Sequence, residues 1–291
     1  MAGPTGVREK EVLDAIAASR RRASAPGEFL DGATSLAVYS AAGRAFRCCA
    51  ACGELENVCL RPGTEERFWE LFDAAHPADP GEKGGPVLSL PLLRFVHAVV
   101  NQQKRVSEAW RARAAHSLAD VPGLSELGEA EAQSALQEVA QLSAASVLAS
   151  SFFEMSGLED TWKPGAAQPP TEAPPCRSLG ELLLSPPTKE GMFQTWIPSL
   201  SKPAMNPTAV TQEVADAYAY LYASLPGGGP LRVWSSNPRA CLGAVELVKS
   251  LYLPLGDVSR IFQAPPANRA LSRVQIEVVA GKLAEALGCT Y

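Results

Sequence analysis

Apolar residues along this chain recur at intervals of three and four, a spacing typical of helices with one buried face. In the first half, the pattern predicts five helices. They are a helix around Val12 that ends before Pro26, a second that begins near Thr34, a third over residues 64–76, a long fourth that starts at Ser89 and includes Val106, and a fifth over residues 130–155.

The second half carries the same period and repeats one helix start signal. Asn206 and Asn237 are each followed by proline, so each can cap a helix whose first position the proline occupies. We expect those helices to end before Pro226 and Pro254, and a last helix to occupy residues 268–288. Only residues 231–234 favour a short strand, so the predicted fold class is all-α.

A proline-rich segment divides the chain. Residues 162–187 contain seven prolines, which remove backbone donors and favour extended geometry. We therefore predict two helical lobes joined by an extended linker, with an N-terminal domain over residues 1–160, the linker over 161–190 and a C-terminal domain over 191–291. The C-terminal domain carries a net charge of +2 and the first 190 residues a net charge of -7.

Composition narrows the class of protein. The chain is 46% hydrophobic, which is enough for a core, and its net charge of -5 gives no global attraction to nucleic acid or anionic lipid. No apolar run reaches the roughly 18 to 20 residues of a membrane span, and no signal segment opens the sequence. We expect a cytoplasmic protein without membrane partners. Any contact with nucleic acid requires a local basic patch.

Four of the seven cysteines lie in the segment FRCCAACGELENVC, residues 46–59. Cys49, Cys52 and Cys59, with His76 or His97 as the fourth ligand, would complete a zinc site. However, no second matching cysteine pair exists, and Cys49 continues the apolar face of the helix that begins near Thr34. We interpret these cysteines as core residues and expect no metal or other cofactor, with a zinc-stabilised interaction module as the alternative.

A second motif is SRRRASAP, residues 19–26. Three arginines before Ser24 resemble the pattern that basophilic kinases read, and a phosphate would reverse the local charge. The alternative is that Arg20, Arg21 and Arg22 favour the end of a helix and remain in solvent. We favour this alternative and keep Ser24 as a candidate phosphorylation site.

A third feature is the polar side of the predicted fourth helix. This side lies opposite the valines and carries polar residues at helical spacing, namely Arg94, His97, Asn101, Lys104 or Arg105, Glu108 and Arg111. Such a face could lie along a phosphate backbone, although it is more often the solvated side of an amphipathic helix.

Enzyme signatures are absent from the sequence. The three histidines have no metalloprotease spacing, and the chain has no phosphate loop, no glycine-rich dinucleotide turn and no Gly-x-Ser-x-Gly motif. We therefore expect a protein that is not an enzyme.

Two segments of the second half carry a resemblance to a known family. The first segment, residues 201–221, runs from a Lys-Pro pair into a predicted helix with Ala215, Asp216, Ala217 and Tyr218, in the sequence SKPAMNPTAVTQEVADAYAYL. The second segment, residues 264–283, places a predicted helix after two prolines, in the sequence APPANRALSRVQIEVVAGKL. Both resemble coat proteins of flexible filamentous plant RNA viruses. The resemblance implies self-assembly around RNA, and hence a location in the virion.

The leading hypothesis is thus a self-assembling structural protein whose partners are copies of itself and, as a coat or nucleocapsid protein, single-stranded RNA. An extended proline-rich segment suits contact with a neighbouring subunit. The candidate RNA-contacting residues are Lys104, Arg105, Arg111, Arg239, Arg269 and Arg273. The alternative hypothesis is an intracellular adaptor or scaffold that binds other proteins and is regulated by phosphorylation near Ser24.

Overall fold

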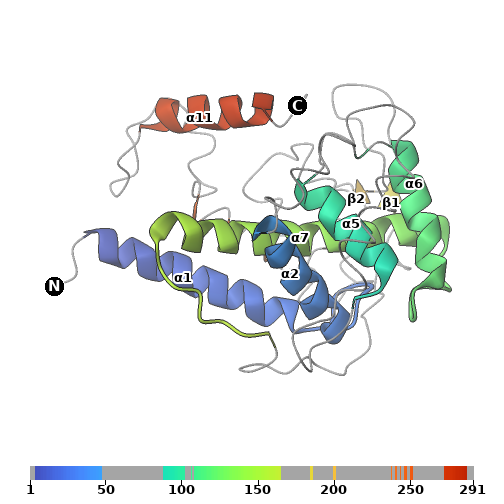
Figure 1. The fold of residues 1–291 in the computed structure, drawn as a ribbon. Coiled ribbons are helices and arrows are strands. Elements are labelled where there is room, and N and C mark those ends of the chain that lie inside the picture. Colours follow the sequence, from blue (N-terminus) through green and yellow to red (C-terminus); the bar gives the residue numbers. More distant parts are fainter. Residues whose placement is uncertain are drawn as a thin grey trace.

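The computed structural model of this chain describes residues 4–47, 88–101, 106, 108–164, 184–185, 199–200, 237, 240, 243, 246–247, 250–251 and 272–286. These residues are predominantly helical, which confirms the all-α prediction (Figure 1). In chain order the elements are α1 (Pro4–Ala23), α2 (Gly32–Arg47), α5 (Leu90–Asn101), α6 (Glu108–His116), the 3-10 helix η2 (Ser117–Asp120), α7 (Glu129–Ser156), β1 (Leu184–Ser185), β2 (Ser199–Leu200) and α11 (Arg273–Ala286). The two short strands form one antiparallel pair.

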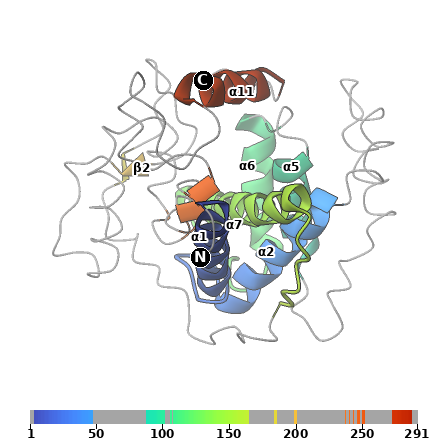
Figure 2. The same ribbon diagram turned by 90° about the vertical axis from the view of Figure 1, so that its left-hand side faces the viewer.

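Helix α7 is the central element of the fold. Figures 1 and 2 show it running through the middle, with α1 and α2 along one side and α5 and α6 against its N-terminal part. Half of its residues are buried, and most of the buried ones are alanine, serine or glutamine. Small side chains let neighbouring helices approach closely, while the surrounding elements supply most of the large ones. The largest fully buried side chains include Ile16, Leu30, Leu36, Tyr39, Phe95, Leu92, Leu118 and Leu136.

Local chemistry explains where several helices begin and end. The Thr34 amide donates to Asp31 Oδ1 at 2.6 Å, so Asp31 caps α2. Before α11, the Ser272 hydroxyl accepts from the Gln275 amide at 3.3 Å and the Gln275 side chain accepts from the Ser272 amide at 2.8 Å, which is a reciprocal capping box. Gly157 ends α7 with a φ of 69°, a left-handed conformation that favours glycine.

The helix predicted to start at Ser89 and to include Val106 is shorter than expected. α5 ends at Asn101, Val106 is not helical, and α6 begins separately at Glu108. The Asn101 side chain donates to the Ala45 carbonyl at 3.1 Å, near the end of α2. This contact holds the end of α5 against α2. Helical periodicity could not predict it, because the two residues are far apart in the sequence.

Residues from the second half of the chain join the same core as α1 and α7. Leu247 is fully buried in that core, and Asn237 Nδ2 donates to the Ser134 carbonyl of α7 at 2.8 Å. Arg22 of α1 forms a two-pronged ion pair with Glu246. The division into two lobes and a linker stays a prediction, but these contacts attach Asn237, Glu246 and Leu247 to the N-terminal helices.

The helix predicted from Asn237 to before Pro254 is helical at each of its described positions beyond residue 239. The predicted helices over residues 64–76 and after Asn206, and the strand over 231–234, lie outside the described residues. Among the helices that the structure describes, none has the length and apolarity to cross a membrane.

Candidate functional site

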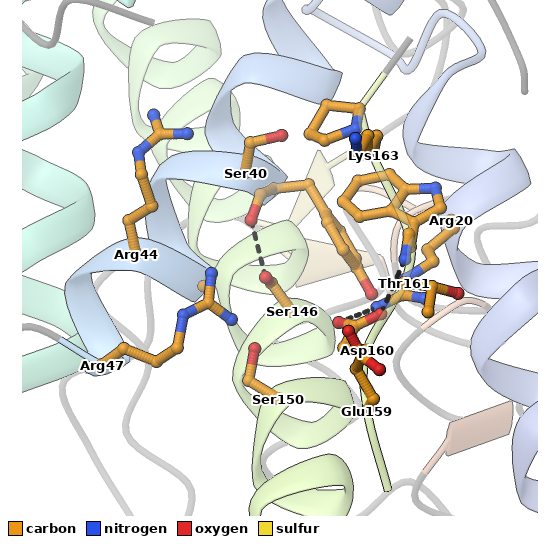
Figure 3. Close-up of a pocket in the computed structure, with 14 residues that line it drawn as sticks. Arg20, Ser40, Arg44, Arg47, Ser146, Ser150, Glu159, Asp160, Thr161 and Lys163 are labelled. Carbon is orange, nitrogen blue, oxygen red and sulfur yellow. Dashed lines mark hydrogen bonds and ion pairs between the residues drawn. The ribbon is translucent and has the colours of Figure 1, made fainter. Parts of the chain in front are cut away.

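A pocket of about 580 Å³ lies where the chain folds back after α7. Because Gly157 turns the chain, residues 158–164 return along α1 and α2 (Figures 1 and 3). The pocket is lined by residues of α2, α7 and this returning segment, and by Arg20 of α1. A volume of this size is typical of small-molecule sites in proteins.

A buried ion pair holds the returning segment in place. Arg20 Nη2 lies 2.5 Å from Asp160 Oδ2, and the Arg20 side chain is largely buried. The Arg20 guanidinium also lies 4.5 Å from the ring centroid of Trp162 and 5.3 Å from that of Phe153. The Trp162 ring meets Tyr39 edge-on at 5.6 Å. Arg20 therefore stabilises one wall of the pocket, and its charge is balanced by Asp160.

The floor of the pocket depends on the absence of a side chain at Gly43. A Cβ there would lie 3.1 Å from Ser146 Oγ, 3.3 Å from Ser150 Oγ and 3.9 Å from Arg47 Nη1. The Ser146 hydroxyl already donates to the Tyr39 carbonyl at 2.6 Å. Ser150 is also largely buried. Polar atoms from α2 and α7 thus gather around Gly43.

The rim of the pocket is rich in cations. Arg44 and Arg47 come from the last turns of α2, and Lys163 comes from the returning segment on the other side, as Figure 3 shows. Arg47 and Lys163 are exposed and form no ion pair with any residue that the structure describes. Glu159 is the only lining carboxylate besides Asp160 among the described residues. Beyond the Arg20–Asp160 pair, the charged lining residues are thus Arg44, Arg47, Lys163 and Glu159 among those that the structure describes.

Arg111 corrects the prediction of a solvated polar face that could lie along RNA. Its side chain is buried, and its guanidinium donates to the Gln133 side chain at 2.9 Å, to the Gln133 carbonyl at 2.9 Å and to Gln137 Oε1 at 3.2 Å. Burial lowers the pKa of Arg111 to about 10, so the side chain remains charged at neutral pH. Arg111 therefore joins α6 to α7 and is not exposed for phosphate contact. His97, expected on the same face, is buried as well.

The segment SRRRASAP also differs from expectation. Ser24 is buried, and its hydroxyl donates to the Arg20 carbonyl at 3.1 Å, so a kinase cannot reach it in this structure without local opening. Arg20, expected in solvent, is 9% exposed because Asp160 and Trp162 cover it. The three arginines do lie in the last turn of α1, as predicted.

The remaining predicted site residues are not described. Lys104, Arg105, Arg239 and Arg269 lie outside the described residues, as do Cys49, Cys52, Cys59 and His76 of the hypothetical zinc site. Arg273 begins α11, and its side chain lies outside the description. Among the described residues, no group of three His, Cys, Asp or Glu side chains could hold a metal ion.

A buried carboxyl group connects the turn between α1 and α2 to α7. Glu138 is 1% exposed, and its Oε2 accepts from the Phe29 amide at 2.8 Å. Burial raises the pKa of Glu138 to about 8, with the nearby Glu28 adding to the increase and the Phe29 amide opposing it. Glu138 is thus mainly a neutral carboxylic acid at neutral pH.

Comparisons of this chain with protein-family models, with curated proteins and with solved structures find no match. The resemblance to filamentous virus coat proteins therefore rests on the two quoted segments alone.

Arg44, Arg47 and Lys163 of the pocket are absent from the sequence-based candidates. Arg44 and Arg47 share one side of α2, but a basic pair near the end of a helix is common and does not indicate a site. Lys163 is more than 100 residues away in sequence and is the second residue of the proline-rich segment 162–187. Only the fold brings these cations together.

Proposed function

We propose that this protein is a non-enzymatic structural protein that assembles with copies of itself, with single-stranded RNA as its cargo. The observation that carries the proposal is the surface of α11. Val274, Val278 and Val279 are each 60% exposed and Leu283 is 59% exposed. Exposed apolar clusters mark interaction surfaces in soluble proteins.

The arrangement of these side chains favours more than one neighbour. At 100° per residue, Val274 and Val278 lie on one side of α11, and Val279 and Leu283 lie about 140° away around the axis. In both Figure 1 and Figure 2, α11 stands apart from α7 and α1. A helix with two separate apolar sides can contact two different copies, which open-ended assembly requires.

The test is size-exclusion chromatography with light scattering, together with the ratio of absorbance at 260 and 280 nm. We expect large particles from the wild type and smaller ones from the double variant Val278→Glu/Leu283→Glu. The matched control is Met155→Glu, because Met155 is a single exposed apolar residue at the end of α7, 78% exposed. It should leave the particle size unchanged. A monomeric wild type would refute self-assembly.

RNA is tested on the same particles. Absorbance typical of nucleic acid, removed by ribonuclease, would support an RNA cargo. The residues to neutralise are Lys104, Arg105, Arg239, Arg269 and Arg273, and their loss should flatten the salt dependence of binding. Unchanged salt dependence would exclude this set as the RNA contact.

A further inference from the structure

Consecutive exposed residues connect the end of α7 to the returning segment, over positions 154–159. Ser156, the last residue of α7, lies within this run. Its hydroxyl donates to the Phe153 carbonyl at 3.3 Å and accepts from the Leu158 amide at 3.3 Å. Hydrogen bonds of this length are weak, so the hydroxyl can turn toward solvent at little cost. Ser156 is therefore accessible to an enzyme in the folded protein, whereas Ser24 is buried.

Two carboxylates follow Ser156 at the spacing that acidophilic protein kinases recognise. Glu159 lies three residues after the serine and Asp160 lies four residues after it. Such kinases have a basic substrate groove, which selects an acidic residue at the third position by electrostatic complementarity. Among the described serines, Ser117 and Ser151 also precede a carboxylate by three residues, but both are half-buried and have an apolar residue at the fourth position. Ser156 thus combines exposure with the acidic pattern.

We propose that Ser156 is a phosphorylation site for an acidophilic serine kinase and that its phosphate loosens the turn at Gly157. In the reaction, the Ser156 hydroxyl oxygen attacks the γ-phosphorus of ATP, and the bond from that phosphorus to the oxygen shared with the β-phosphate breaks. ADP leaves with the electron pair of the broken bond, and the hydroxyl proton passes to the catalytic aspartate of the kinase. The proposal depends neither on self-assembly nor on RNA.

The position of Ser156 sets the direction of the effect. The C-terminus of a helix carries a partial negative charge, and a phosphate adds close to two more negative charges at neutral pH. Glu154 and Glu159 are exposed on either side of Ser156 in the sequence, so they repel the phosphate as well. The Gly157 amide, which donates to the Phe153 carbonyl at 3.1 Å, should therefore exchange with solvent about two- to fivefold faster.

The anchor of the returning segment provides an internal control. Asp160 pairs with the buried Arg20, and the Trp162 amide donates to Asp160 Oδ1 at 3.1 Å. Helix-dipole effects fall off within the last turn, so hydrogen exchange at Trp162 should stay unchanged. Phosphorylation thus loosens the end of α7 while the anchor of the returning segment stays in place.

Incubation of the folded protein with casein kinase II and ATP, followed by peptide mass spectrometry, tests the site. We expect a phosphate on Ser156, and Ser156→Ala should remove it. Glu159→Gln should slow the labelling severalfold, because it removes the carboxylate at the third position. The matched control is Glu154→Gln, which removes an exposed carboxylate before Ser156 and should be labelled at the wild-type rate. Peptide mapping separates Ser156 from Ser178, which shares the spacing and lies outside the described residues.

Hydrogen exchange followed by mass spectrometry tests the loosening of the turn. The phosphorylated wild type is compared with the untreated wild type and with Ser156→Ala after the same incubation, which carries any other phosphate but not this one. Gly157 should exchange faster only in the phosphorylated wild type, and Trp162 should exchange at the same rate in all three samples. Circular dichroism melts establish that every variant folds.

The site assignment is wrong if the folded protein gains no phosphate at Ser156 or if Ser151 is labelled as fast as Ser156. It is also wrong if Glu159→Gln and Glu154→Gln slow the labelling equally. Unchanged exchange at Gly157 after phosphorylation of Ser156 would overturn the loosening of the turn.

Discussion

Replacing Glu138 with glutamine should change how the stability of this protein depends on pH. The Glu138 carboxyl group is buried between the turn that precedes α2 and the middle of α7, and burial raises its pKa from an ordinary value of 4.5 to about 8 in the folded protein. Folding therefore favours the protonated form. Glutamine keeps an oxygen that can accept from the Phe29 amide and cannot ionise.

The sign and size of the effect follow from proton linkage. Between about pH 4.5 and pH 8 the unfolded chain has released the Glu138 proton while the folded chain keeps it, so stability falls as pH rises. The slope approaches about 1.4 kcal/mol per pH unit inside this window. From about pH 5.5 to 7.5 the wild type should thus lose about 2.5 kcal/mol through Glu138, a sizeable part of the stability of a typical domain.

Urea unfolding followed by circular dichroism at several pH values measures this loss. Glu138→Gln should show a flatter dependence than the wild type and should gain relative stability as pH rises. The exposed Glu154 on the same helix gives a control, Glu154→Gln, which should follow the wild type. If the curves of wild type and Glu138→Gln run parallel between about pH 5.5 and 7.5, the assigned protonation of Glu138 is wrong.

Two further substitutions test the packing. Leu247→Ala should destabilise the protein by about 2–5 kcal/mol in urea unfolding, because Leu247 is fully buried in the core shared with α1 and α7. A loss of stability below about 0.5 kcal/mol would show that Leu247 does not belong to that core. Arg111→Met should lower the free energy of unfolding by about 1–3 kcal/mol, since it leaves the acceptors on Gln133 and Gln137 without their donor. The same variant should bind a single-stranded oligouridylate as the wild type does. Reduced affinity without loss of stability would instead place Arg111 on an RNA surface.

The helices of the described core were largely predictable because their determinants are local. The predicted range 130–155 nearly coincides with α7, and the predicted end of the first helix before Pro26 agrees with α1 ending at Ala23. The gap between α5 and α6 was not predictable from periodicity, because the Asn101 side chain meets the Ala45 carbonyl across a large sequence separation.

Site residues were harder to predict because a polar side chain that local spacing places in solvent can be buried by partners from elsewhere in the chain. Arg111 and Arg20 both lie at positions that suit a solvated helix face, yet each is covered by partners from a distant segment. Lys163 and Arg47 of α2 line the same pocket although they are more than 100 residues apart, which no spacing within the sequence encodes.

The ion pair between Arg22 and Glu246 also has a consequence for synthesis. The two residues are 224 positions apart, and the adjoining Leu247 completes the core around α1 and α7. A growing chain leaves the ribosome N-terminus first. Helices α1, α2, α5, α6 and α7 are therefore made well before Leu247, which covers part of their apolar surface. During that interval chaperones, or neighbouring nascent chains on the same messenger RNA, encounter an incomplete core.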